Sequence, residues 1–362
     1  MANEAGLESR EAVSEEGRGR CKKGDKGTDG ACRVKLFHLL TLAVGAPLLG
    51  LLVYHVGPLT LWRQFRGLGW ALVPLVLLEG AGTLFHTQGW RHCVSGPLRS
   101  LSFRRVFCVL MAGGSINYLT PTAGLGGEVT KGTLLAMEGA GPQAATAVLL
   151  DKLFCALAQL IFIVSGCCAL LSSVTMGPAL WSVLVAVTVV LACGIVGFLL
   201  VQRYGKLGAI VRWCARHRLQ GPAFMKTAGF MNEVDEELRR FYTTRPLDLI
   251  LSVSWHFAGL LWGVVPVFYF LALTAPSPSL SRAASIVVLG VWFDLVSFAI
   301  PVDIGVQEGT RLLTFRILGL SSALGLAYGV TRRLQQLVWA GIGLLLYGVL
   351  VSARPVPRRP LA

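Results

Sequence analysis

Two glutamates are the first candidates for functional residues in this chain. Each lies in an apolar stretch and has a cation three residues later. Segments Pro121–Lys131 and Pro301–Arg311 align without gaps, 180 residues apart, and share a proline, a glutamate seven residues on, a threonine and a cation. An ionisable residue inside a membrane costs about 2.5–3.5 kcal/mol and marks a functional site by default. Paired breaks of this kind, in matching places of two halves, are typical of a transporter's substrate site.

The charged groups of the first motif (121–131) and the second motif (301–311) allow two interpretations. Each Glu/cation pair can recognise the charged headgroup of a substrate. It can also be a structural ion pair, since residues three apart share a helix face. We favour substrate binding. The predicted substrate-binding residues are Asn117, Pro121, Gly126, Gly127, Glu128, Thr130, Lys131, Pro301, Gly305, Glu308, Thr310 and Arg311.

The glycines of the motifs also allow two interpretations. Tight turns can expose backbone N–H groups at the start of a helix, where a phosphate or another anion binds well. The same glycines can instead allow close packing of two helices. Gly124, Gly126, Gly127 and Lys131 do not have the spacing of a nucleotide-binding loop.

Polar residues beside the motifs form a second group of candidates. Asn117 and Ser297 each stand four residues before a motif proline. At membrane depth their side chains can bind substrate or the backbone carbonyls that a proline frees. The charged members of this group are Asp151, Lys152, Asp294, Asp303, Arg332 and Arg333.

Catalytic and metal-binding patterns are not evident in the sequence. The nine cysteines show no metal-ligand spacing, and most lie in apolar runs, so we predict no metal site, no disulfide and no cofactor. His86 and His256 also fall in apolar runs. They can form a proton relay or pack as neutral side chains, and we favour packing. No triad of nucleophile and base can be argued, which favours a protein that is not an enzyme.

The elements that must position these residues are membrane helices. Hydrophobic residues make up 54% of the chain and charged residues only 14%, where a soluble domain has about 25% charged residues. The net charge of +14 raises the question of nucleic-acid binding. Basic loops beside membrane helices explain that charge, so we predict no nucleic-acid partner.

The predicted fold is an all-α polytopic membrane protein with about six full transmembrane helices and two re-entrant helical hairpins. A span needs about 20 apolar residues. The predicted spans are 36–56, 70–90, 144–171, 178–201, 247–273 and 333–351. The hairpins cover 106–137 and 283–320, each containing one motif, because the arm after each motif is too short and too charged to cross alone. Around this membrane domain (36–352) we predict a disordered cytoplasmic arm (1–35), a cytoplasmic connector (202–246) and a cytoplasmic tail (353–362).

The distribution of basic residues predicts the orientation. With the N-terminus inside, 26 of the 33 Lys and Arg residues lie on the cytoplasmic side. Both termini are then cytoplasmic, and the two hairpins open to opposite sides as inverted repeats. Inverted repeats are the arrangement of carriers that work by alternating access. Gly341 and Gly343 allow close helix contacts, within the chain or in a homo-oligomer.

The chain resembles the family of lysylphosphatidylglycerol synthase transmembrane regions, also called flippase-like proteins. The resemblance rests on Asn117–Pro121, on Gly126, Gly127, Glu128 and Lys131, and on Pro301, Gly305 and Glu308. It implies a membrane domain that moves or holds lipids, including aminoacylated phospholipids, in the plasma (inner) membrane of a bacterium. With only ten residues after Ser352, we expect no soluble domain that would transfer lysine.

Three functions follow from these observations, and we favour the first. It is a lipid translocator that moves or presents a polar, anionic or glycolipid headgroup, with membrane lipids as its partners. The second is a membrane enzyme that modifies a lipid headgroup. The third is an accessory subunit of a lipid or hopanoid biosynthesis pathway that does not itself transport.

Overall fold

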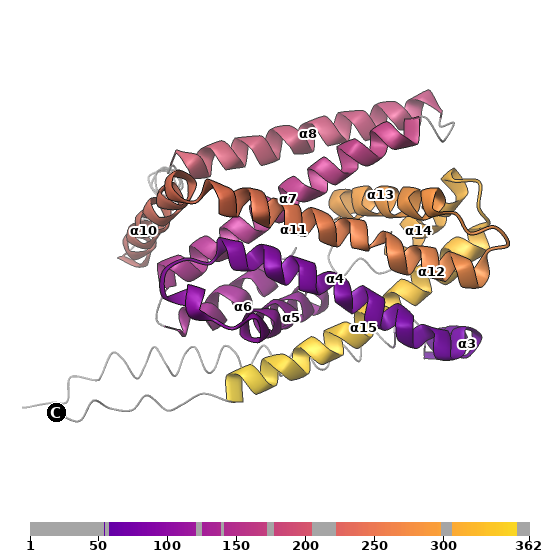
Figure 1. Cartoon of the computed structure of the whole chain (residues 1–362), viewed down its shortest axis with the longest axis horizontal. Coiled ribbons are helices and arrows are strands. Elements are labelled where there is room, and N and C mark those ends of the chain that lie inside the picture. Colours follow the sequence, from indigo (N-terminus) through magenta and orange to yellow (C-terminus); the bar gives the residue numbers. More distant parts are fainter. Residues whose placement is uncertain are drawn as a thin grey trace, which may run out of the picture. The chain divides into compact units, whose positions relative to one another are not determined.

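The computed structural model describes residue 54 and the ranges 58–120, 125–138, 141–171, 177–204, 222–297 and 306–352. Within these ranges every regular element is a helix (Figure 1), which confirms the predicted all-α class. The elements are α3 (Pro58–Leu68), η1 (Gly69–Ala71), α4 (Leu72–Cys93), η2 (Gly96–Ser100), α5 (Phe103–Leu119), α6 (Leu125–Ala136), α7 (Gly141–Leu171), α8 (Pro178–Arg203), α10 (Pro222–Thr244), α11 (Pro246–Trp262), α12 (Val264–Thr274), α13 (Leu280–Ser297), α14 (Val306–Ile317) and α15 (Ser322–Ser352).

Five of the described segments are long and apolar enough to cross a membrane. They are Arg66–Cys93, Gly141–Leu170, Trp181–Arg203, Pro246–Thr274 and Ser322–Ser352. They correspond to five of the six predicted spans; the first, 36–56, lies outside the described residues apart from Tyr54. Only 6% of the most apolar window in α8 is buried within the protein. Such an all-apolar exposed surface is what a helix facing lipid requires.

The last span begins eleven residues earlier than predicted, at Ser322 instead of Arg333. The predicted span placed Arg333 at the start of a helix, but Arg332 and Arg333 both lie inside α15. The Ser321 hydroxyl accepts a hydrogen bond from the Leu324 N–H (3.2 Å) and caps the helix before the arginines. Their charges do not end the helix because carboxylates from other helices neutralise them.

Each motif joins a pair of shorter helices that is followed by a long one. Around the first motif the helices α5, α6 and α7 have 17, 12 and 31 residues. Around the second motif α13, α14 and α15 have 18, 12 and 31 residues. Gly319, with φ +70°, ends α14, and the Leu320 N–H donates to the Phe315 carbonyl (2.8 Å) as in a Schellman cap. The two intervals predicted as hairpins therefore each contain two helices.

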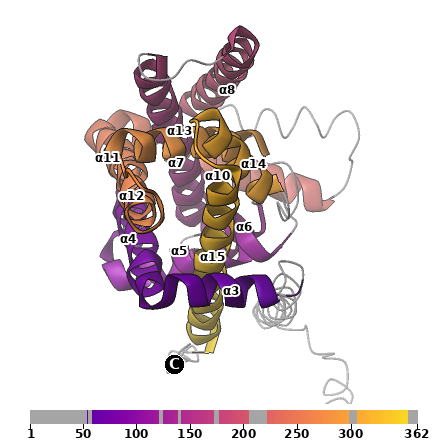
Figure 2. The ribbon, with the colours of Figure 1, turned by 90° about the vertical axis from the view of Figure 1, so that its right-hand side faces the viewer.

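The main core lies where helices from both halves of the sequence meet. Trp90 of α4, Ile116 of α5, Phe154 of α7 and Tyr347 of α15 belong to one buried cluster. Contacts between α5 and α15 and between α4 and α11 bring the two halves together (Figures 1 and 2). A Cβ at Gly343 would overlap the Ser115 hydroxyl of α5. That glycine therefore serves packing within the chain.

The connector (202–246) also has a sequence pattern that predicts a short helix over 231–242, and the structure has a helix there. It is the longer helix α10, whose Val234, Leu238 and Phe241 are buried. Gln143 at the start of α7 donates a hydrogen bond to Glu237 (3.0 Å) and helps to fix α10 there. Residues 205–221 of the connector lie outside the described residues.

Gly127 allows α6 to pack closely against α5. A Cβ at Gly127 would overlap the Gly113 carbonyl oxygen and the Asn117 side chain, whereas one at Gly132 would have only Val148 as a neighbour, at 3.9 Å. We expect Gly127→Ala to lower the free energy of unfolding by about 1–3 kcal/mol through overpacking. Gly132→Ala, on the same helix, should be neutral or slightly stabilising. Unfolding in mixed detergent micelles would compare them, and equal stabilities would contradict this account.

Candidate functional site

The first motif places a buried ion cluster between α6 and α7. The Lys131 ammonium lies 2.9 Å from Glu128 and 3.3 Å from Asp151. The exposed fractions of these three side chains are 8%, 14% and 7%. The ammonium also lies 5.3 Å from the centre of the Trp90 ring, a favourable position for a cation. The predicted contact between Glu128 and Lys131 is confirmed, and Asp151 is an additional partner.

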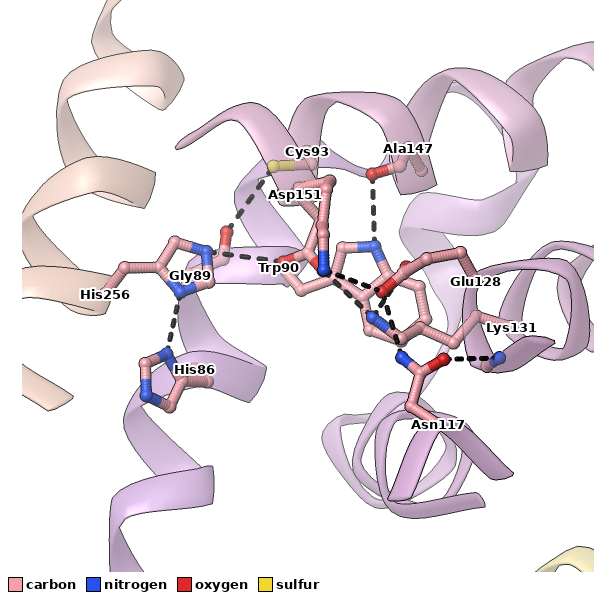
Figure 3. Close-up of polar contacts among 12 residues, drawn as sticks. His86, Gly89, Trp90, Cys93, Asn117, Glu128, Lys131, Ala147, Asp151 and His256 are labelled. Carbon is pink, nitrogen blue, oxygen red and sulfur yellow. Dashed lines mark hydrogen bonds and ion pairs between the residues drawn. The ribbon is translucent and has the colours of Figure 1, made fainter. Parts of the chain in front are cut away.

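Asn117 fixes the start of α6. Its side-chain oxygen accepts a hydrogen bond from the Gly127 N–H (2.6 Å), and its amide group donates to Glu128 (3.3 Å; Figure 3). A side chain that accepts from an N–H of the first helical turn acts as a cap. The Gly127 N–H is thus used within the protein, so this glycine serves packing and capping in the structure.

Two histidines extend the first cluster across three helices. His256 of α11 lies 3.3 Å from Asp151 through Nε2, and its Nδ1 lies 2.9 Å from the Nδ1 of His86 on α4 (Figure 3). The His256 ring packs on Gly89, one turn after His86, and the His86 ring packs on Gly259, one turn after His256. The neighbours that a Cβ would meet are His256 at Gly89 and His86 at Gly259. The sequence contains this signal as two His-x-x-Gly segments.

In the second motif Glu308 pairs with a cation of the long helix that follows. Arg333 of α15 donates to Glu308 (2.9 Å) and to the Tyr118 hydroxyl of α5 (3.0 Å). Only 1% of the Arg333 side chain is exposed. In the first motif Lys152 of α7 lies 3.6 Å from Glu128 from a largely exposed position. Both motif glutamates therefore reach a cation on the next helix.

Arg311 does not pair with Glu308, which corrects the prediction for the second motif. Its Nη2 donates to both carboxylate oxygens of Asp294 on α13 (2.7 and 2.6 Å). Only 3% of the Arg311 side chain is exposed. Its Nε and Nη1 find no hydrogen-bond acceptor among the residues that the structure describes. Gly290 leaves room for the guanidinium, because a Cβ there would lie 2.7 Å from Nη1.

Two adjacent cavities lie beside these clusters. The larger, about 390 Å³, is lined by polar residues that include Asn117, Tyr118, Lys131, Asp151 and His256. The smaller, about 190 Å³, is lined by charged residues that include Asp294, Arg311 and Arg332. Glu79 of α4, which forms an ion pair with Arg332, lines both, as do Thr83, His86 and Leu260. Lys131 of the first motif thus lines the larger cavity, and Arg311 of the second motif lines the smaller one.

Sequence comparison matches residues 38–343 to the lysylphosphatidylglycerol synthase TM region, a range that contains both motifs. The chain belongs to this family. Its membership and its apolar helices make it an integral membrane protein. Comparison with curated proteins and with solved structures found no match.

The other residues predicted for the site in this family member do not all line the cavities. Thr130 and Thr310 bond to backbone carbonyls of their own helices, those of Gly126 (2.8 Å) and Gln307 (2.9 Å). Neither Glu128 nor Glu308 lines the two cavities; each holds a cation instead. Four predicted residues lie outside the described ranges, namely Pro121, Pro301, Asp303 and Gly305.

Glu79 and the two histidines are the site residues that sequence reasoning missed or set aside. Glu79 is a lone carboxylate in an apolar span, and that alone marks a functional position by default. His86 and His256 are 170 residues apart. Only packing of α4 against α11 shows that they face each other.

Proposed function

We propose that this family member translocates lipids with an anionic headgroup, binding the phosphate in the cavities while the acyl chains stay in the bilayer. The proposal rests on the buried and only partly satisfied guanidinium of Arg311. A buried guanidinium with two nitrogens lacking acceptors among the described residues is costly, and a phosphate would offer oxygens to both nitrogens. Arginine is also the side chain best suited to bind phosphate through paired hydrogen bonds.

The arrangement of the two motifs supports movement of the headgroup between two positions. Lys131 lines the larger cavity and Arg311 the smaller one, and His86 and Glu79 lie at the boundary that the cavities share. The matching helix lengths around the motifs support an internal repeat. We infer that the repeats are inverted and re-entrant, so that the site opens alternately to each side of the membrane. From the distribution of Lys and Arg we place both termini in the cytoplasm.

Transport can be measured with the purified chain in liposomes that contain phosphatidylglycerol labelled on one acyl chain. A reductant that cannot cross the membrane quenches label only in the outer leaflet. We expect the protein to increase the fraction of phosphatidylglycerol that becomes quenched, with a smaller effect on phosphatidylcholine. Empty liposomes are the control.

The same liposomes distinguish the other functions. A new lipid species found by mass spectrometry, without faster exchange between leaflets, would identify an enzyme that modifies headgroups. Neither exchange nor a new species, from protein shown to be folded and monodisperse, would contradict translocation and favour an accessory subunit.

A further inference from the structure

We propose that His86, His256 and Cys155 form a binding site for a transition-metal ion of the Zn²⁺ class. Their three ligand atoms lie within 4.8 Å of one another. They come from α4, α11 and α7, which are far apart in the sequence and meet beside the larger cavity. The proposal does not depend on lipid translocation, and it reverses the expectation that the chain has no metal site.

The ligand types and their spacing suit such an ion. Imidazole nitrogen and thiolate sulfur are the donors that zinc prefers, at about 2.0–2.1 and 2.3 Å. In a tetrahedral site those bond lengths separate two ligand atoms by about 3.3–3.7 Å. The Nδ1 atoms of His86 and His256 are 2.9 Å apart, and the third ligand lies within 4.8 Å. Shifts of about 1 Å, within reach of side-chain rotation, would complete the geometry.

Asp151 supplies the outer partner that a metal-bound histidine requires. A histidine that binds metal through one ring nitrogen normally donates its other N–H to a carboxylate. The Nε2 of His256 lies 3.3 Å from Asp151, and both atoms are buried without a well-formed hydrogen bond to a described residue. An ion on Nδ1 keeps the proton on Nε2, where it donates to Asp151. Lys131 holds that carboxylate from its other oxygen.

The charge of the neighbouring side chains and the adjacent larger cavity also favour the binding of a cation. The buried side chains of Glu128, Lys131 and Asp151 carry a net charge of −1. Binding releases the Cys155 thiol proton to water, so the thiolate adds another negative charge. A divalent ion then balances the buried group, while Lys152 reaches Glu128 from an exposed position. All three ligands line the larger cavity, which leaves a fourth coordination position facing that space.

Direct metal analysis tests the site without any transport assay. The full-length protein is stripped with a chelator, supplied with Zn²⁺ and desalted, and its zinc content is measured by mass spectrometry. Co²⁺ replaces Zn²⁺ in a parallel sample as a spectroscopic probe of thiolate ligation. We expect about one Zn²⁺ per chain above the content of the His256→Gln and His86→Gln variants, and a thiolate-to-cobalt band that Cys155→Ser removes.

Two further variants separate a metal site from a packing role. Asp151→Asn should keep the ion but weaken its affinity about 10- to 100-fold. Cys167→Ser changes another partly buried cysteine of α7 and should alter neither zinc content nor the cobalt band. Zinc content that is the same in wild type and His256→Gln, each monodisperse by gel filtration, would overturn the proposal. The histidines would then form only a hydrogen bond to each other.

Discussion

Replacing Arg311 by glutamine is expected to slow phosphatidylglycerol exchange between leaflets at least about tenfold. Arg311 lines the smaller cavity, and the change removes its charge and the two buried nitrogens that lack acceptors among the described residues. Hydrogen bonds to charged groups contribute about 1.5–3 kcal/mol each, and 1.4 kcal/mol corresponds to a factor of ten. The partner left behind, Asp294, has 46% of its side chain exposed, so its carboxylate can be solvated and the fold should persist. The initial rate of quenching in liposomes measures the effect.

Arg316 provides the matched control, because it is an exposed arginine on the same helix. Arg316→Gln should exchange phosphatidylglycerol at the wild-type rate. Arg311→Lys should recover only part of the activity, since an ammonium cannot make the paired planar contacts of a guanidinium. Wild-type exchange by Arg311→Gln would show that this arginine does not bind the headgroup.

Replacing Arg333 by methionine is expected to produce the largest loss of stability, about 3–5 kcal/mol. The guanidinium neutralises Glu308 at 2.9 Å and donates to Tyr118 at 3.0 Å. Removing Arg333 takes away the cation of this pair, and breaking a buried ion pair is strongly destabilising. The fold also loses a link between α5, α14 and α15. The free energy of unfolding in mixed micelles measures the change.

The double variant Arg333→Met/Glu308→Gln distinguishes loss of charge balance from loss of packing. It removes both charges of the pair and should regain more than half of the lost stability, because neither charge of the broken pair remains. If the double variant is as unstable as Arg333→Met alone, packing of the arginine stem is the dominant contribution. A single variant within about 1 kcal/mol of wild type would contradict a structural role for the pair.

The ion pairs of the two motifs show where the spacing of residues in the sequence predicts a contact correctly and where it does not. Glu128 and Lys131, three residues apart on α6, form the predicted contact, because neighbours one turn apart are placed by the helix itself. Glu308 and Arg311 have the same spacing, yet each pairs with another helix. Asp294 offers Arg311 two oxygens and Arg333 offers Glu308 a guanidinium. Those partners are visible only once α13, α14 and α15 have packed.

The sequence by itself determined the membrane class, the family, five of the apolar helices and the two motifs at which helices end. These properties depend on local composition and on the periodicity of apolar residues, both of which are read along one segment. Tertiary structure alone decided the contact between His86 and His256, the approach of Cys155, the position of Arg311 beside a cavity and the burial of Arg333. These depend on close packing between different helices, which no spacing rule within one helix encodes.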